Sequence, residues 1–345
     1  MKSLLYSLSS LLIATSVFAN DIYVQQSGDN LDMDIVQDGE NNQIEALSGS
    51  GDAQLSGNNK TVSFNQTGNT NEIRVWTHGG NQQMSVIQDG NSNISKVDNH
   101  GDNNNISVDI DGDSNITHSE IGNGGDSGNN MSLTIDNGDS NVVYSEVLSG
   151  DSNNVDVQIH KQDNSYVYVR VNGDSNNVKA WQGKHEDGTV DVDETGDHEA
   201  YWTVTGDNNA LASYQTDTNR GGGGGAGHHI ANVISGDSNS VSHRQRGKAG
   251  HDGFIEIQGD NNDVSLDQKG SGGVKWADIV LDGDGHSVDS NQRGTGSANL
   301  ALDLTNSGGA YSVTTNQNTS TTHRSYSLTG SCTNANGCGI TITQN

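Results

Sequence analysis

The chain has no proline among its 345 residues, and aromatic residues make up only 5% of it. Hydrophobic residues account for 30%, which is lean for the single large core of an ordinary globular enzyme. Low hydrophobicity with a formal net charge of −28 is also typical of disordered chains. A regular repeat argues against disorder here, because a thin stack of strands needs only a narrow apolar column. The lack of proline fits a stack, since proline would remove a ladder hydrogen bond.

Positive charge is scarce, with 16 Lys and Arg against 44 Asp and Glu. Proteins bind nucleic acid largely by neutralising phosphates with Lys and Arg, so we expect no nucleic-acid partner. The same argument disfavours anionic membrane surfaces. Cations, basic partners or saline surroundings suit this chain better.

The first 19 residues have the pattern of a secretion signal. Lys2 supplies the charged start, residues 4–17 are mostly apolar, and small residues precede a predicted cut after Ala19. The apolar run is short and serine-rich for a membrane anchor, and no later segment could span a bilayer. We therefore expect an exported protein, either secreted or held at the cell surface, with no membrane insertion.

The two cysteines, Cys332 and Cys338, lie close together near the C-terminus. In an exported chain this spacing predicts one small disulfide loop. The residues between them lack the further ligands of a zinc site. We interpret the pair as the staple of a C-terminal cap.

The dominant pattern is a repeat of about eleven residues with the core Gly-x-x-Asn followed by an apolar residue. From Gly57 to Gly112 a glycine recurs every 11 residues. The turn glycines that we assign are Gly39, Gly68, Gly90, Gly101, Gly138, Gly150, Gly173, Gly206, Gly236 and Gly259. A fixed short period indicates stacked identical units, so recurring polar residues are attributed first to the architecture.

Residues 62–77 show how one unit folds. Val62, Phe64 and Gln66 alternate with polar residues before the turn, and Asn71 and Ile73 resume the same face after it. This period of two predicts two strands joined by a tight turn in which glycine takes a positive φ. Two strands and two turns give an all-β solenoid with coils of about 22 residues, stacked at about 4.8 Å. Buried Gln and Asn would then form amide ladders, each side chain bonding its copy in the next coil.

The array divides into several predicted segments. Residues 1–19 form the signal peptide, 20–215 the main solenoid, 216–229 a glycine-rich loop or hinge, and 230–310 the second part of the solenoid. Residues 184–193 are expected to form a smaller loop. Beyond about Gly309 the repeat fades, and residues 311–345 are interpreted as a Thr/Asn-rich tail with the disulfide-looped cap.

The pattern Gln-x-Gly-x-x-Asn followed by alternating apolar residues resembles the curlin repeat of curli fibre subunits. It stands at residues 35–44, 65–73 and 86–94. The resemblance implies a secreted β-solenoid subunit that stacks end to end into amyloid-like fibres for adhesion and biofilm matrix. It also implies partners: further copies or other curlin-like subunits, and an export and assembly machinery.

By this analogy the ladder residues of the best-matching copies are Gln37, Asn42, Gln66, Asn71, Gln88 and Asn93. The asparagines of further repeat copies are assigned to the same ladders: Asn104, Asn153, Asn176, Asn209, Asn239 and Asn262.

Several turns read Gly-Asp-(Ser/Asn)-Asn, beginning at Gly101, Gly112, Gly138, Gly150, Gly173, Gly206, Gly236 and Gly259. Stacked corners would bring carboxylates on adjacent coils about 5 Å apart, which costs about 1 kcal/mol per pair in water. Asp favours turns by bonding its own backbone, so we expect no dedicated cofactor or metal site. Ca²⁺ along these acidic turns is the weaker alternative.

No nucleophile elbow or metal-hydrolase spacing occurs, and coils of about 22 residues leave no room for a deep pocket. His228 and His229 adjoin the glycine run, where a loop position is expected rather than a ligand pair. We therefore predict a structural protein that assembles into, or decorates, extracellular fibres, and not an enzyme. The second hypothesis is a non-polymerising acidic rod that acts as an adhesin or binding module.

Overall fold

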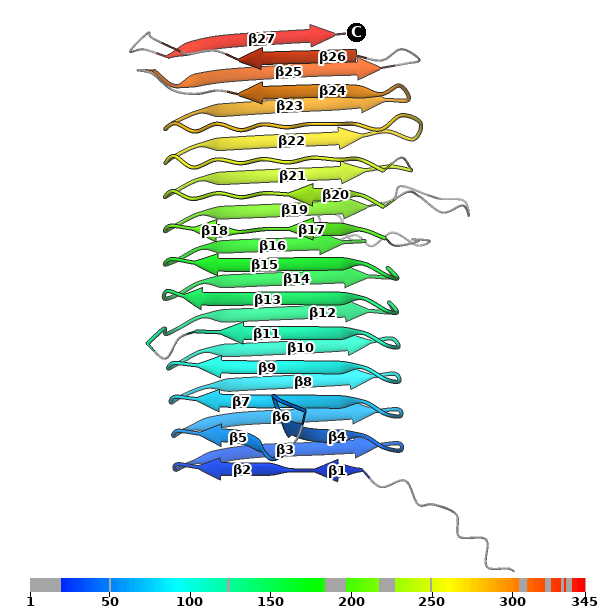
Figure 1. The fold of residues 1–345 in the computed structure, drawn as a ribbon, viewed down its shortest axis with the longest axis vertical. Helices are drawn as coiled ribbons and strands as arrows, with labels where there is room; N and C mark the ends of the chain where they lie inside the picture. The colour runs from blue at the N-terminus through cyan, green and yellow to red at the C-terminus, as the bar shows by residue number, and fades with distance from the viewer. Residues whose placement is uncertain are drawn as a thin grey trace, which may run out of the picture.

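The computed structural model is an all-β solenoid whose coils stack along one axis (Figure 1), as the repeat predicted. The structure describes residues 20–49, 51–122, 125–183, 197–216, 227–248, 250–303, 309–319, 324–329, 332 and 337–344. The predicted signal peptide, the predicted loop at 184–193 and the glycine run within 217–226 lie outside the described residues.

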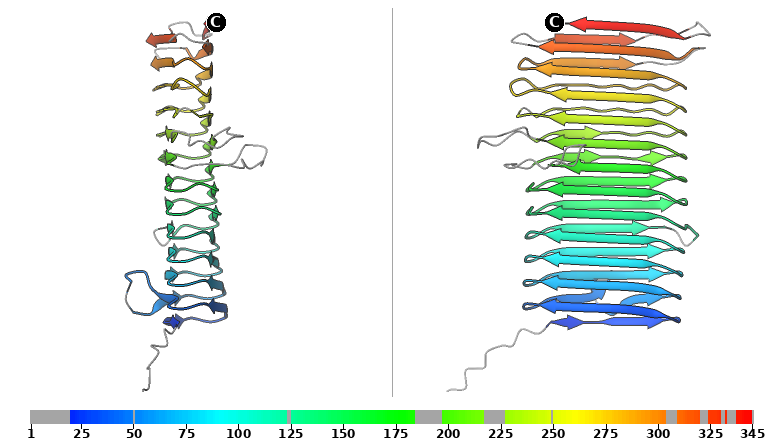
Figure 2. Two further views of the ribbon diagram at one scale, coloured as in Figure 1. Left: turned by 90° about the vertical axis from the view of Figure 1, so that its right-hand side faces the viewer. Right: turned by 180° about the vertical axis from the view of Figure 1, so that it is seen from behind.

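Two parallel sheets face each other across a thin core (Figure 2). Sheet B has 13 strands: β3 (Leu31–Asp38), β6 (Lys60–Thr67), β8 (Gln83–Asp89), β10 (Asn105–Asp111), β12 (Asn130–Asp136), β14 (Asn154–His160), β16 (Asn177–Gln182), β19 (Ala210–Thr216), β21 (Ser240–Arg246), β22 (Asp263–Lys269), β23 (Ser287–Gly294), β25 (Tyr311–Thr319) and β27 (Cys338–Gln344).

Sheet A has 12 strands: β1 (Asp21–Ile22), β2 (Val24–Ser27), β4 (Gln43–Ala46), β5 (Ala53–Ser56), β7 (Glu72–His78), β9 (Ile94–His100), β11 (Ile116–Ile121), β13 (Val142–Ser149), β15 (Tyr166–Asn172), β17 (Glu199–Tyr201), β18 (Val204–Thr205) and β20 (His229–Ala231). Beyond β20, alternate burial continues through Ile255, Ile257, Ile279 and Leu281. The pair β24 (Ala298–Asp303) and β26 (Arg324–Thr329) completes this side.

Strands pair in register, so equivalent residues lie over one another. Val62 pairs with Met84, and Met84 with Ile106. Ladder bonds in this region join residues 22 apart, whereas others join residues 29 or 33 apart. The coil length therefore varies, and the extra residues lie between strands. The connection between β4 and β5 is one such insertion and projects from the sheet A side (Figure 2, left).

The alternation read from residues 62–77 is confirmed. Val62, Phe64 and Gln66 are buried, as are Asn71 and Ile73 across the turn. The intervening side chains face outward. Repetition of this pattern fills the space between the sheets with one continuous apolar cluster from Ile44 to Cys332.

The stack is more continuous than the sequence indicated. On either side of residues 217–226, β19 pairs in register with β21 in sheet B. The stack of strands also continues beyond Gly309, because β25 pairs with β23 and β27 pairs with β25. A disulfide joins Cys332 to Cys338, the first residue of β27. The predicted tail therefore contributes two further strands to sheet B.

Candidate functional site

A ladder of glutamine side chains runs inside sheet B near the ends of its first strands. Gln37 Nε2 donates to Gln66 Oε1 at 2.7 Å, and Gln66 Nε2 donates to Gln88 Oε1 at 2.9 Å. Ile110, Ile135 and Ile159 follow in the same column. A buried amide needs a partner, and its copy in the next coil supplies one.

A second glutamine ladder follows these isoleucines, and it was not predicted from the sequence. Each Gln donates its Nε2 to the Oε1 of the next at 2.9 to 3.2 Å. Its members are Gln182, Gln215, Gln245, Gln268, Gln292, Gln317 and Gln344. The signal was present as Gln-x-Gly at Gln245, Gln268 and Gln292. It was overlooked because no asparagine follows those glycines at the repeat position.

The predicted asparagines occupy two corner columns, in which they bond turn backbone atoms as well as one another. Asn71 Nδ2 donates to the Gly90 carbonyl at 2.8 Å, and its Oδ1 accepts from the backbone N–H of Asn93 at 3.0 Å. The Asn side chains thus bond turn backbone atoms in addition to the predicted side-chain ladder. That ladder is formed further along this column, where Asn115 Nδ2 donates to Asn93 Oδ1 at 3.2 Å and Asn141 Nδ2 donates to Asn115 Oδ1 at 3.1 Å. This corner begins with Asn42, Asn71 and Asn93 and continues through Asn115 and Asn141.

The opposite corner holds the remaining predicted asparagines and one more, Asn129. Each Oδ1 accepts from the next backbone N–H at 2.8 to 3.0 Å. The column contains Asn104, Asn129, Asn153, Asn176, Asn209, Asn239 and Asn262. The assigned ladder residues therefore belong to three separate columns, one of glutamines and two of asparagines.

Histidine and lysine replace asparagine at particular levels of these corners. His198, His228 and His251 continue the column of Asn141, and the His198 and His228 rings stack at 5.0 Å. His228 is buried in the connection just before β20, whereas His229 is the first residue of β20, so the expected loop position is wrong for His229. Burial and the neighbouring His228 lower the pKa of His198 well below its usual value. The same two causes lower the pKa of His251 to about 3.

Two buried lysines take the asparagine position at Lys60 and Lys275. Lys60 Nζ donates to the Gly79 carbonyl, and Lys275 Nζ donates to the Gly273 carbonyl, each at 2.8 Å. Lys275 also bonds the Gly296 carbonyl. Burial lowers the pKa of each ammonium to about 8. Each lysine thus satisfies turn carbonyls that an asparagine amide satisfies elsewhere.

The turn glycines are required mainly by close stacking. A Cβ on Gly68 would lie 2.0 Å from the Gly90 carbonyl oxygen, and Gly68 has φ +102°. Positive φ is not general, because Gly138, Gly236 and Gly259 lie outside the left-handed region. There the contact alone excludes a side chain, at 2.1 to 2.3 Å from a carbonyl oxygen of the next coil. A second left-handed position follows two residues after Gly68, at Thr70 with φ 62°.

The acidic turns stack into a corner column with defined partners. Asp207 Oδ1 accepts from the backbone N–H of Asp174 at 2.7 Å, and Asp237 Oδ1 accepts from that of Asp207 at 2.8 Å. The column runs through Asp151, Asp174, Asp207, Asp237, Asp260 and Asp284. The carboxylates therefore bond the backbone of the adjacent coil, and not their own turn backbone as the sequence suggested. Within the described ranges, no group of three or more His, Cys, Asp or Glu is placed to hold a metal ion.

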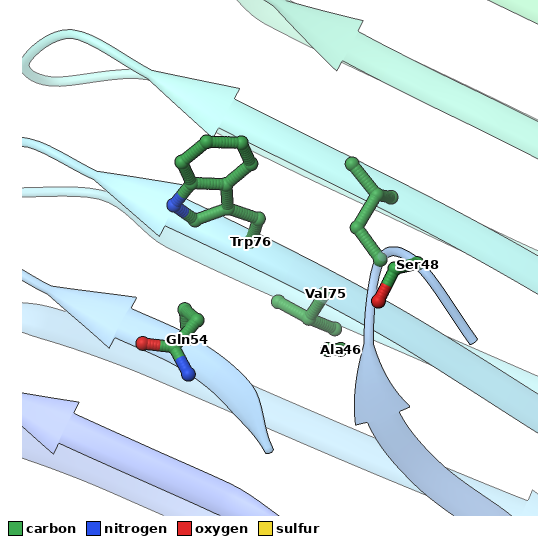
Figure 3. Close-up of a pocket in the computed structure, with 6 residues that line it drawn as sticks. Ala46, Ser48, Gln54, Val75 and Trp76 are labelled. Atoms are coloured by element: carbon green, nitrogen blue, oxygen red, sulfur yellow. The ribbon is translucent and has the colours of Figure 1, made fainter. Parts of the chain in front are cut away.

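The outer surface of the described residues carries open hollows. One of about 490 Å³ lies between the β4–β5 connection and Trp76 of β7 (Figure 3). Its lining residues are Ala46, Leu47, Ser48, Gln54, Val75 and Trp76, none of which titrates near neutral pH. Beside it, a hydrogen bond to Glu72 and burial raise the pKa of Glu45 to about 7. Arg74 Nε lies 3.5 Å from Glu45, so these groups form an ion-pair network on the sheet.

Both ends of the stack are open. β3 and β27 are the terminal strands of sheet B, and each pairs on one side only within the described part of the chain. Met33 is 37% exposed, although Val62 and Met84 in the same column are 3% exposed. At the other end Ile340 and Ile342 are half-buried, while Val313 in the next strand is buried. Within the described ranges, no further layer covers the interior columns at either end of the stack.

No protein-family model matches the chain, and a search of curated proteins found no similar sequence. The curlin resemblance accordingly rests on the repeat motif. Among the described residues there is no helix long and apolar enough to cross a membrane.

Proposed function

We propose that this chain is an exported structural subunit that assembles end to end into extracellular amyloid-like fibres, as its curlin-like motif implies. Its partners are further copies of itself or related subunits, delivered by an export and assembly machinery, and its role is adhesion and biofilm matrix. The proposal is for a structural role without a cofactor and not for catalysis.

The supporting observation is that the two open ends present the same columns. Alignment through the register places Met33, Ile35 and Gln37 of β3 in the columns that end at Ile340, Ile342 and Gln344 of β27. A second copy whose β3 stacks on β27 would place Ile340 over Met33 and Ile342 over Ile35. Gln344 would then bond Gln37 and extend the glutamine ladder across the junction.

Two kinds of interaction would stabilise such a junction. The edge strands β3 and β27 present backbone N–H and C=O groups that another strand can pair with. The half-exposed apolar side chains at each end would lose contact with water, which is the main favourable term in association. The same contacts already hold each coil to the next inside the molecule.

The test is electron microscopy of residues 20–345 after dilution from denaturant into saline buffer. Unbranched fibres that lengthen with time are the expected result. Ile342→Lys should stop elongation because it places a charge in the junction column. Thr341→Lys is the matched control, since Thr341 faces outward on the same strand. Dispersed rods of one subunit's length from the unmodified chain would overturn the proposal.

A binding rod that does not elongate is the second candidate. An aromatic cluster on the outer face of sheet A favours it. The Tyr166 ring lies 6.2 Å from Tyr144 and 5.5 Å from Tyr201, and Tyr201 lies 5.5 Å from His229. Aromatic side chains are enriched at interfaces because they bury a large area. If the microscopy experiment shows only dispersed rods, this aromatic face becomes the candidate binding surface.

A further inference from the structure

The outer face of sheet B carries two charge clusters of opposite sign near the C-terminal ends of its strands. The acidic cluster consists of Asp89 on β8, Asp109 and Asp111 on β10, and Asp136 on β12. The basic cluster consists of Arg244, Arg246, Lys269 and Arg293 on β21, β22 and β23. The chain has only 16 Lys and Arg in all, so four on three neighbouring strands are a marked concentration.

The acidic cluster is electrostatically unfavourable as it stands. Its four carboxylates line an open hollow of about 430 Å³ together with His160, whose Nδ1 lies 2.9 Å from Asp136. Burial and the neighbouring carboxylates Asp89 and Asp136 raise the pKa of both Asp109 and Asp111. A positively charged surface placed against this hollow would relieve the repulsion.

Asp267 of β22 lies within the basic cluster and bonds two of its members. Asp267 Oδ1 lies 2.7 Å from Arg246 Nη2, and Asp267 Oδ2 lies 3.0 Å from Arg293 Nη2. One carboxylate is thus shared by two guanidinium groups. Lys269 and Arg293 remain exposed on the outer row, with Arg293 at 54%.

The two clusters are placed symmetrically along the sheet. β16 is the seventh of the 13 strands, and β10 and β22 are each three strands away from it. A two-fold axis at the level of β16 would bring β8 level with β23, β10 with β22, and β12 with β21. Because the outward rows are in register, Asp89 would face Arg293, Asp111 would face Lys269, and Asp136 would face Arg246.

We propose that two copies of this chain associate side by side as an antiparallel dimer, with the acidic cluster of each against the basic cluster of the other. The contact is isologous, so each dimer contains both sets of ion pairs. Trp181 of β16 lies at the two-fold level, where it meets its own copy. Asp109 would face Asp267, whose charge is already balanced by Arg246 and Arg293.

This association is independent of the proposed end-to-end assembly. It uses the flank of the solenoid and closes at two copies, whereas stacking uses β3 and β27 and does not close. Combining each variant below with Ile342→Lys blocks the end junction and leaves the flank unchanged. Failure of fibre growth and failure of dimer formation are therefore distinguishable.

The first test is a charge exchange followed by sedimentation equilibrium at low salt. Asp111→Lys should weaken the dimer by at least about tenfold, because like charges would face each other. Lys269→Asp should weaken it similarly. The double variant should recover affinity to near the original value, since the exchanged pair is restored at both symmetric sites. Asp52→Lys, an exposed position in the β4–β5 connection, makes the same change in net charge and should have little effect.

The second test determines the orientation by distances between spin labels on Ser107 of β10 and Ser265 of β22. An antiparallel dimer places Ser107 of one copy level with Ser265 of the other. A mixture of chains labelled at Ser107 with chains labelled at Ser265 should therefore give a short distance between labels. A sample in which every chain carries the label at the same position should give a longer one, with the two labels about 29 Å apart along the axis. The disulfide need not be reduced if the labels are introduced through unnatural amino acids.

Several outcomes would overturn the proposal. One is a chain that stays monomeric at about 100 μM in low salt, whether or not a polyanion such as heparin binds the basic cluster. A second is a dimer unaffected by Asp111→Lys, or one that the double variant fails to restore. A third is a distance between identical labels that is shorter than the distance between Ser107 and Ser265 labels, which would indicate a parallel arrangement.

Discussion

The Nδ1 atom of His228 accepts a hydrogen bond from the backbone N–H of His251 at 3.0 Å, and the two rings stack with centroids 5.0 Å apart. An accepting Nδ1 must be unprotonated, so this contact requires a neutral His228 ring. His198 makes the same contact one coil earlier. The corner therefore depends on neutral imidazoles in place of the asparagine amides found at other levels.

Acid should destabilise this part of the stack. The pKa of His251 lies at about 3 and that of buried His243 at about 4, both below the ordinary 6.5. The folded state then binds fewer protons than the unfolded chain, so its stability is complete above about pH 6.5 and is lost as the pH falls toward 4 and 3. Calorimetric melting temperatures between pH 7.5 and 4 would measure this loss.

The matched variant for that experiment is His228→Asn with His251→Asn, which restores the residue used elsewhere in the column. It should melt like the original chain at pH 7.5 and lose less stability in acid. An acid-induced decrease of the same size in the variant would show that other groups are responsible.

Gln268→Ile should destabilise the chain, although isoleucine occupies the same column at Ile110, Ile135 and Ile159. Gln245 Nε2 and Gln292 Oε1 would each lose a partner at 2.9 Å. A buried polar group left unsatisfied costs about 1 to 3 kcal/mol. Urea unfolding followed by circular dichroism measures the effect. Ser265→Ala on the outward side of β22 should change stability by less than about 0.5 kcal/mol.

Gly173→Ala should be much more disruptive than Gly51→Ala. Both glycines have positive φ, at +118° and +95°, so both substitutions strain the backbone. Only at Gly173 would the new Cβ meet an atom, the Gly206 carbonyl oxygen at 2.1 Å. Thermal melting of the two variants separates the cost of stacking from the cost of conformation. Equal melting temperatures would contradict the requirement for close approach.

Asp207→Asn should stabilise the chain in low salt. Asparagine keeps the oxygen that accepts from Asp174 N–H, as Asn91 does for Asn69 N–H in the other corner. Removing one carboxylate relieves repulsion of about 1 kcal/mol from each neighbour at about 4.8 Å. The gain should shrink at high ionic strength, because salt screens exposed charges. Melting temperatures at about 10 mM and 500 mM NaCl compare the two conditions, and a gain that persists unchanged in high salt would refute the electrostatic explanation.

The sequence was sufficient to predict the solenoid because period and burial repeat together in stretches such as Val62 to Ile73. It was insufficient where a residue of another type fills the same position. His228 and Lys275 occupy the position that asparagine holds elsewhere in their corner column, because an imidazole nitrogen or an ammonium group can also bond turn backbone. Gln317 and Gln344 were missed because the glycine marker is lost there, while the inward alternation persists. The local sequence pattern predicts the period of the coils. The type of hydrogen-bonding side chain at each position depends on the residues of the neighbouring coil.

The ladders and corner columns present nearly the same interface at every level, so the architecture has translational symmetry and no intrinsic length. A whole coil could be removed or duplicated between equivalent residues, for example between Val62 and Met84, and each remaining coil would still meet a compatible neighbour. The number of coils can therefore change by recombination without redesign of the core. Rod length is then set by how many copies of the unit the gene carries, and not by any feature of folding.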